Sequence, residues 1–189
     1  MPARSDIDVT PAEPPNPRAS RMIALDQVDN AVLIEGIALW RSLCAGHSYP
    51  SRTAITARLL KPLLRNTTLL RVVDGGRDYE YRVVGDAFVM AHGRSFQGLC
   101  WSQIQRLSPG FYAYIKPIYD QVVQTGMPLA TRGWIERGAE SKGHVYCEYV
   151  YLPLGGEEAG VDHILIFAVY LRQDGIEHVS PAITGSFAD

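Results

Sequence analysis

The most informative part of the sequence is residues 66–104, NTTLLRVVDGGRDYEYRVVGDAFVMAHGRSFQGLCWSQI. Two runs rich in β-branched and aromatic residues flank Gly75-Gly76, a pattern that predicts an antiparallel hairpin and fits a turn better than a phosphate-binding loop. Gly85 is expected to end the second strand, and residues 86–92 to form a short helix with Gly93 as its C-terminal cap. The sequence beyond Gly93 predicts further short helical pieces.

Side chains alternate along the second predicted strand, so one face of the hairpin must turn toward the helices. We expect Tyr79, Tyr81 and Val83 to face the helices, and Glu80 and Arg82 to face solvent or a partner. The reason is that burying an unpaired charge is costly. The opposite orientation is the alternative.

Two helices are predicted upstream of the hairpin. In the first, apolar residues recur at helical spacing from Val28 to Cys44, Asp26 or Asp29 can cap its start, and Gly46 can end it. A second, shorter helix is expected from about residue 53 to residue 61, before Pro62. A single amphipathic helix is marginally stable in water, so the first helix must pack its apolar stripe on the chain's own sheet or on another chain.

The second half of the chain is expected to contain one long helix and three strands. An amphipathic pattern opens at Pro109 and ends at Gly126, and strands are predicted at residues 130–137, 145–154 and 163–171. The last of these is apolar on both faces, as expected of a central strand. Two strands, then helices, then three strands imply an α+β fold with a five-stranded antiparallel sheet and helices on one face.

The composition predicts one domain with tails. The chain has 189 residues, of which 47% are hydrophobic, and a formal net charge of -2. We expect a disordered Pro-rich arm at 1–24, a helical extension at 25–62, a core at 63–173 and a flexible tail at 174–189. The absence of a basic excess argues against nucleic acid as a partner. No apolar run approaches the roughly 20 residues of a membrane span and no secretory pattern is present, so we expect no membrane partner and a cytoplasmic location.

No recognisable motif for catalysis or metal binding is present. The five histidines are far apart and the three cysteines are scattered, at His47, His92, His144, His163, His178, Cys44, Cys100 and Cys147. None follows a zinc spacing, and no nucleophile elbow is found. The sequence therefore predicts no metal site and no enzymatic activity.

Several features before the hairpin, taken together, resemble a known class. They are Trp40 in a helix, then Pro50-Ser51-Arg52, then Leu63-Leu64 just ahead of the first strand. With the hairpin, they resemble a PAS domain, and specifically a bacterial class in which a lone PAS domain makes up nearly the whole protein. The resemblance covers about residues 30–172. It implies a stand-alone sensory or interaction module and a homodimer, with a dimer interface on the first helix at Leu33, Ile37 and Trp40.

The same resemblance implies a site between the helices and the sheet, where a PAS domain would hold a small apolar or aromatic ligand. The expected lining residues are Tyr81, Val83, Phe88, His92, Trp101, Phe111, Tyr114, Ile115 and Tyr149. The alternative is that these aromatic side chains simply fill the core. His92 can bond a ligand there or, alternatively, can be exposed at the end of its helix. A signalling protein is the other expected partner.

Two common PAS cofactors are disfavoured by the residues present. The long helix, residues 109–126, lacks a histidine for haem, and Gly93-Arg94 is followed by Ser95-Phe96 rather than by the Asn-Cys of flavin-binding light sensors. No cofactor is therefore predicted. Two other functions stay open at this point: a small α+β enzyme of the cone-shaped kind, and a purely structural dimerisation module. A buried carboxylate beside a histidine would favour the enzyme.

Overall fold

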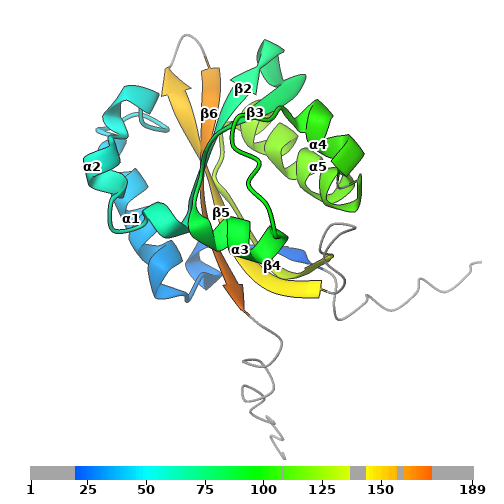
Figure 1. Cartoon of the computed structure of the whole chain (residues 1–189). Coiled ribbons are helices and arrows are strands. Elements are labelled where there is room, and N and C mark those ends of the chain that lie inside the picture. The colour runs from blue at the N-terminus through cyan, green and yellow to red at the C-terminus, as the bar shows by residue number, and fades with distance from the viewer. Residues whose placement is uncertain (1–19, 108, 137–143, 157–159, 172–189) are drawn as a thin grey trace, which may run out of the picture.

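The computed structural model describes residues 20–107, 109–136, 144–156 and 160–171. The predicted tail at 174–189 and most of the predicted arm at 1–24 lie outside these ranges. Within them, one antiparallel sheet has the strand order β1-β4-β5-β6-β2-β3 (Figure 1). Its strands are β1 (Arg21–Ile23), β2 (Thr67–Val73), β3 (Asp78–Val84), β4 (Leu129–Glu136), β5 (His144–Gly156) and β6 (Gly160–Leu171).

The five predicted strands are all present, and the predicted α+β architecture is confirmed. The strand β1 is an addition to the prediction. It lies in the segment that we expected to be part of a disordered arm, and it pairs with β4 from Arg21↔Arg132 to Ile23↔Ala130. Three residues are too short a run to show a strand pattern, so this strand could not be predicted from the sequence.

The hairpin of β2 and β3 turns through a short 3-10 segment, η4 (Asp74–Gly76). Asp74, Gly75 and Gly76 all have positive φ, at 49°, 65° and 95°, which explains why glycine fills two of these positions. The predicted turn is therefore confirmed. Farther along, the pairing passes from Leu69↔Val83 to Leu70↔Tyr81. This irregularity leaves Arg82 without a partner residue on β2, as in a β-bulge.

Three helices cover one face of the sheet, called the inner face here. They are α3 (Asp86–His92), α4 (Trp101–Leu107) and α5 (Pro109–Thr125), drawn in green in Figure 1. The bounds of α3 are those predicted, and Gly93 ends it with φ 75°. The start of α5 at Pro109 and its end before Gly126 are also confirmed.

The first predicted helix, α1 (Ala31–Leu43), lies on the other face of the sheet, called the outer face, with α2 (Ala57–Leu60) beyond it (Figure 1). It starts later than predicted. Asn30 is its cap, because its Oδ1 accepts the Val32 N–H at 3.0 Å. Asp29 lies one residue before the cap position, and its carboxylate pairs with Arg132 instead.

The second predicted helix is interrupted. It forms a 3-10 turn, η2 (Arg52–Ala54), and then α2. The break falls at Ile55, which is extended, because the Thr56 hydroxyl accepts the Leu59 N–H at 3.3 Å and so caps a new helix start. Another 3-10 turn, η3 (Leu64–Asn66), leads into β2.

The two faces of the sheet carry two separate cores. The outer core is mainly aliphatic and includes Leu33, Ile37 and Trp40 of α1, which are 1%, 5% and 5% exposed. Trp40 Nε1 also donates to the Pro153 carbonyl at 2.8 Å. The predicted dimer interface at these three residues therefore does not fit the structure, because the chain buries them itself. The alternative, a helix lying on its own sheet, is what the structure has.

Candidate functional site

The inner face carries a closed circuit of eight aromatic rings. In order around the circuit these are Trp101, Tyr81, Phe88, His92, Tyr170, Tyr149, Tyr151 and Tyr119. Successive ring centroids are between 4.1 and 6.1 Å apart, the range in which aromatic side chains attract one another. The rings come from β3, α3, α4, α5, β5 and β6. The circuit, which we call the aromatic circuit, therefore ties the three inner helices to the sheet.

The sheet beneath one part of the aromatic circuit carries small side chains. Ala168 lies opposite Tyr149 in the pairing of β5 with β6, and Cys147 lies opposite Tyr170. Both are 2% exposed or less and belong to the inner core. An alanine and a cysteine rise less from the sheet than a leucine or isoleucine would. The two tyrosines therefore lie diagonally across this pair of strands, each opposite a small side chain.

Two hydroxyl groups in this part of the circuit are buried without a hydrogen bond. Neither the Tyr149 hydroxyl nor the Tyr170 hydroxyl makes a hydrogen bond of good geometry among the described residues, although the two hydroxyls lie near enough to each other to affect each other's pKa. Burial raises the pKa of both well above the usual value for tyrosine, so both are neutral donors. By contrast, the Tyr81 and Tyr119 hydroxyls lie 3.1 Å apart, and Tyr79 donates to Asp120 at 2.7 Å. A buried donor without a partner is uncommon and marks a place for a ligand atom or a water.

Seven of the nine predicted lining residues lie at the inner core. Five are buried members of it, namely Tyr81, Phe88, Trp101, Ile115 and Tyr149. Tyr114 is partly buried against them. His92 is 8% exposed and stacks on Phe88 at 4.1 Å, so the alternative of an exposed helix-terminal histidine is wrong. Phe111 is on α5, and its side chain lies outside the described ones.

Val83 is placed wrongly by the prediction. It packs against the outer core, whereas Val84 packs against the inner core. The cause is the bulge at Arg82, which adds one residue and so reverses the alternation of faces beyond it. Tyr79 and Tyr81 precede the bulge and face the helices as expected, both 0% exposed. The outward orientation of Glu80 and Arg82 is also confirmed, and the two side chains pair at 2.7 Å.

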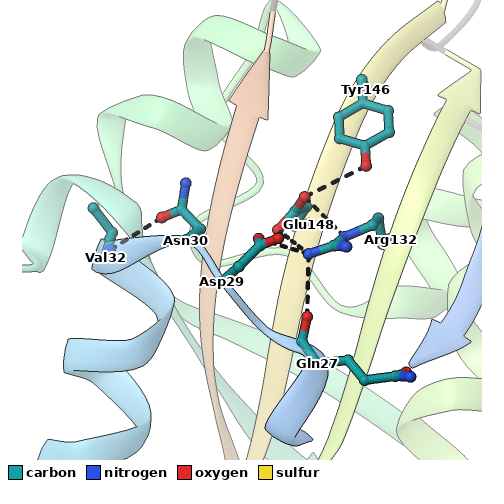
Figure 2. Close-up of polar contacts among 7 residues, drawn as sticks. All are labelled: Gln27, Asp29, Asn30, Val32, Arg132, Tyr146 and Glu148. Carbon is teal, nitrogen blue, oxygen red and sulfur yellow. Dashed lines mark hydrogen bonds and ion pairs between the residues drawn. The ribbon is translucent and has the colours of Figure 1, made fainter. Parts of the chain in front are cut away.

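A group of charged residues lies on the outer face, where the segment before α1 crosses the edge of the sheet (Figure 2). Arg132 of β4 is at its centre. Its Nε is 2.9 Å from Glu148 Oε1, and its terminal nitrogen is 2.7 Å from Asp29 Oδ1 and donates to the Gln27 carbonyl at 3.3 Å. Although burial opposes it, these two carboxylates raise the pKa of Arg132. Tyr146 donates to Glu148 at 3.4 Å.

A buried carboxylate beside a histidine, the arrangement that would favour an enzyme, is not found among the described residues. Glu148, 7% exposed, is the one buried carboxylate among the described residues. Its ion pair is with Arg132, and it lies on the opposite face of the sheet from His92. Within the same residues, no three His, Cys, Asp or Glu side chains lie together as a metal site would require. No helix in the described ranges has the length and apolar character of a membrane span.

Two small hollows lie outside the aromatic circuit. One, of about 300 Å³, is lined by Arg21, Met22, Ile23, Gln27 and Arg132. The other, of about 200 Å³, lies beside the hairpin turn and is lined by Gly75, Gly76, Arg77, Tyr79, Asp120, Val123 and Gln124. In the second hollow the Asp120 carboxylate is held by Lys116 at 2.8 Å and by the Tyr79 hydroxyl. Both hollows are open and partly polar, unlike the aromatic circuit.

Among the solved structures similar to this chain are PAS and light-oxygen-voltage (LOV) domains. The PAS domain of the fruit-fly ELK potassium channel is 18% identical, with a TM-score of 0.44 over 61% of this chain and 93% of that chain. A LOV domain studied with a flavin analogue is 12% identical, with a TM-score of 0.44 over 64% and 87%. The Rhodobacter sphaeroides LOV protein is 15% identical, with a TM-score of 0.42 over 64% and 71%. Neither a family model nor a curated protein matches the chain.

The order of elements decides the fold. A hairpin, three helices and three further antiparallel strands follow one another as predicted, and the first and last strands of that set, β2 and β6, pair at the centre of the sheet. The chain has a PAS-like fold. Its α1 and α2 add a layer on the outer face of the PAS-like sheet, and β1 adds a strand at its edge.

Sequence reasoning missed part of the PAS-like inner face. Tyr119, Tyr151 and Tyr170 complete the aromatic circuit but were not predicted to line it. In β6 both faces are apolar, so no periodicity tells which side Tyr170 is on. The one signal available in the sequence was the assignment of Tyr149, on the neighbouring strand, to the inner face, which would place Tyr170 there too if the two residues were neighbours. Using it required the register of β5 with β6, which the sequence does not specify.

Proposed function

We propose that this chain is a sensory or interaction module that binds a small, neutral aromatic molecule at the aromatic circuit. The observation that supports this most directly is the pair of buried hydroxyls of Tyr149 and Tyr170, which lie near each other and make no hydrogen bond of good geometry among the described residues. A ligand oxygen or nitrogen that accepts from both would satisfy two donors at once. Binding would then be signalled to a protein partner or to a second copy of the chain.

The chemistry of the surrounding side chains narrows the ligand class. The eight rings of the circuit belong to Tyr, Trp, Phe and His, and none of them is a carboxylate, a guanidinium or an ammonium group. A cationic ligand would lose its hydration there without gaining an ion pair, and an anionic ligand would have only the imidazole of His92 to pair with, so either is costly. A flat aromatic ligand keeps favourable ring contacts on both sides. The ligand that we propose is therefore an aromatic ketone, phenol or neutral N-heterocycle rather than haem or flavin.

The experiment that tests this is native mass spectrometry of the chain purified from its own host, followed by denaturing extraction. We expect a reproducible additional mass of small-molecule size that is released on unfolding. The double variant Tyr149→Phe, Tyr170→Phe should lose it, because the rings stay and the two donors go. Tyr79→Phe is the matched control, since its hydroxyl donates to Asp120, and it should keep the additional mass. The proposal would be contradicted if the wild-type chain carried no additional mass. It would also be contradicted if the wild-type chain, the double variant and Tyr79→Phe all carried the same amount.

A further inference from the structure

The segment of residues 20–29, called the N-terminal strap here, crosses the edge of the sheet and contacts both faces. Its strand β1 pairs with the edge strand β4. At one end, Ser20 contacts α5 on the inner face, because the Tyr114 hydroxyl donates to Ser20 Oγ. At the other end, Gln27 and Asp29 contact Arg132 on the outer face (Figure 2). The strap therefore joins two surfaces that the sheet otherwise keeps apart.

The attachments of the N-terminal strap are few and partly exposed. Its pairing with β4 spans three residues, and Met22 is 52% exposed. In the ion pair with Arg132, the Asp29 side chain is 77% exposed, so solvent weakens that contact. Val28, 7% exposed, is the one buried side chain of the strap, whereas Leu33, Ile37 and Trp40 anchor the helix that follows. Segments of this kind open locally at a far lower cost than the whole fold.

Tyr114 links the N-terminal strap to the aromatic circuit. Its side chain packs against the inner core, and it lies near enough to Tyr151 of the circuit to contribute to the raised pKa of that residue, after burial. Burial raises the pKa of Tyr114 itself, so its hydroxyl is a neutral group with one proton to donate. In the structure, that proton goes to Ser20. When a ligand acceptor takes that proton, the present bond is lost, and Ser20 can keep the contact only by turning its own hydroxyl proton toward the Tyr114 oxygen.

We infer that the N-terminal strap is a releasable latch and that the Tyr114 hydroxyl is its control point. This inference rests on the proposed function, because the signal is a ligand at the aromatic circuit. A ligand that accepts from Tyr114 competes with Ser20 and favours the state in which β1 has left β4. A ligand shifts an equilibrium only by its differential affinity for the two states. Here the difference comes from one hydrogen bond, because the Tyr114 hydroxyl donates to Ser20 in the closed state and to the ligand in the released state. Release uncovers the β4 edge and frees Arg132 from Asp29 and Gln27.

The latch is tested first in ligand-free protein by amide hydrogen exchange, read in residues 20–28. We expect Tyr114→Phe to speed exchange there about three- to tenfold, the change that corresponds to losing one hydrogen bond from the closed state. Ser20→Ala should have the same effect, and the double variant no larger one, because both single changes remove the same bond. Tyr79→Phe removes another inner-face hydroxyl, remote from the strap, and should leave exchange in residues 20–28 unchanged.

Exchange in β5 and β6 is the internal control, because faster exchange there would report a loss of the whole fold. Unchanged exchange in residues 20–28 of Tyr114→Phe, or additive effects in the double variant, would overturn the latch. A second comparison uses the co-purified complex and protein from which the ligand has been removed. We expect faster amide exchange of the strap in the complex, and slower or equal exchange there would overturn the role of the ligand in releasing the latch. If no ligand co-purifies, the proposed function and the ligand control fail together. The ligand-free comparison still decides whether the latch exists.

Discussion

At the scale of single residues, a buried tyrosine hydroxyl stabilises the fold when it makes a hydrogen bond and destabilises it when it makes none. Tyr149 makes no hydrogen bond of good geometry among the described residues, with only the Tyr170 hydroxyl near it, whereas Tyr79 donates to Asp120 at 2.7 Å. An unsatisfied buried donor costs free energy because it has lost its water, and removing it relieves that cost. The same atom that we propose for ligand binding therefore destabilises the empty protein.

The first prediction follows from this difference. In ligand-free protein, Tyr149→Phe should raise the free energy of unfolding by about 1 kcal/mol, and Tyr79→Phe should lower it by about 1 kcal/mol. Urea denaturation followed by far-UV circular dichroism measures both. A loss of stability in Tyr149→Phe equal to that in Tyr79→Phe would mean that the Tyr149 hydroxyl has a stabilising partner, either the Tyr170 hydroxyl or a fixed water, and is not available to a ligand.

The limits of sequence reasoning are also clearest at this scale. Tyr79 and Tyr81 were placed correctly because alternation along a strand is a strict rule. Val83 was misplaced because one extra residue, Arg82, reverses that rule, and nothing in the run from Tyr81 to Val84 distinguishes a bulge from a regular strand. Leu33, Ile37 and Trp40 were correctly seen as an apolar stripe. The sequence cannot say whether such a stripe meets its own sheet or another chain.

At the scale of elements, α1 lies so close to the sheet that one of its positions admits no side chain. A Cβ atom added at Gly36 would lie 2.3 Å from the ring of Phe167 on β6. Glycine is a poor helix former, so its presence in the middle of α1 is explained by this close approach. The contact is what allows Leu33 and Ile37 to reach the outer core.

The second prediction concerns this contact. Gly36→Ala should lower the free energy of unfolding by about 1–3 kcal/mol, because the cost of overpacking exceeds the gain in helix propensity. Phe167→Leu in the same chain should recover part of the loss by making room. Thermal denaturation of the two single variants and the double variant measures the recovery. Stability losses that simply add would show that the helix does not meet the sheet at this point.

Most elements could be predicted because their signals are local. The turn at Gly75-Gly76, the cap at Gly93 and the opening of α5 at Pro109 each depend on residues within a few positions. The failures came where a distant residue intervenes. Asn30 rather than Asp29 caps α1, while Asp29 pairs with Arg132, which is 103 residues away in the sequence, and β1 is paired with the distant strand β4.

At the scale of the whole molecule, the two sides of α1 should respond differently to a charge. Leu33, 1% exposed, belongs to the outer core, whereas Ile34, 47% exposed, points away from it. The third prediction is that Leu33→Asp unfolds the chain, because a buried unpaired carboxylate costs several kcal/mol, and that Ile34→Glu changes the free energy of unfolding by less than about 0.5 kcal/mol.

Circular dichroism and light scattering of the two variants check this prediction and the proposed homodimer together. If the chain dimerises through α1, its exposed side must make the contact, and Ile34→Glu should give folded monomers. A dimer that persists in Ile34→Glu would exclude this helix as the interface. A folded Leu33→Asp chain would contradict the packing of α1 on the sheet.

The sheet that separates the two cores also separates two tryptophans. Trp101 lies in the inner core, 1% exposed, and Trp40 lies in the outer core, 5% exposed. Replacing one indole at a time, with Trp134 also replaced, would leave a single fluorophore on a chosen side. The emission of each would report loosening of its own layer alone. The protein thus carries a built-in pair of optical probes, able to tell whether an event begins among the aromatic rings or beneath α1.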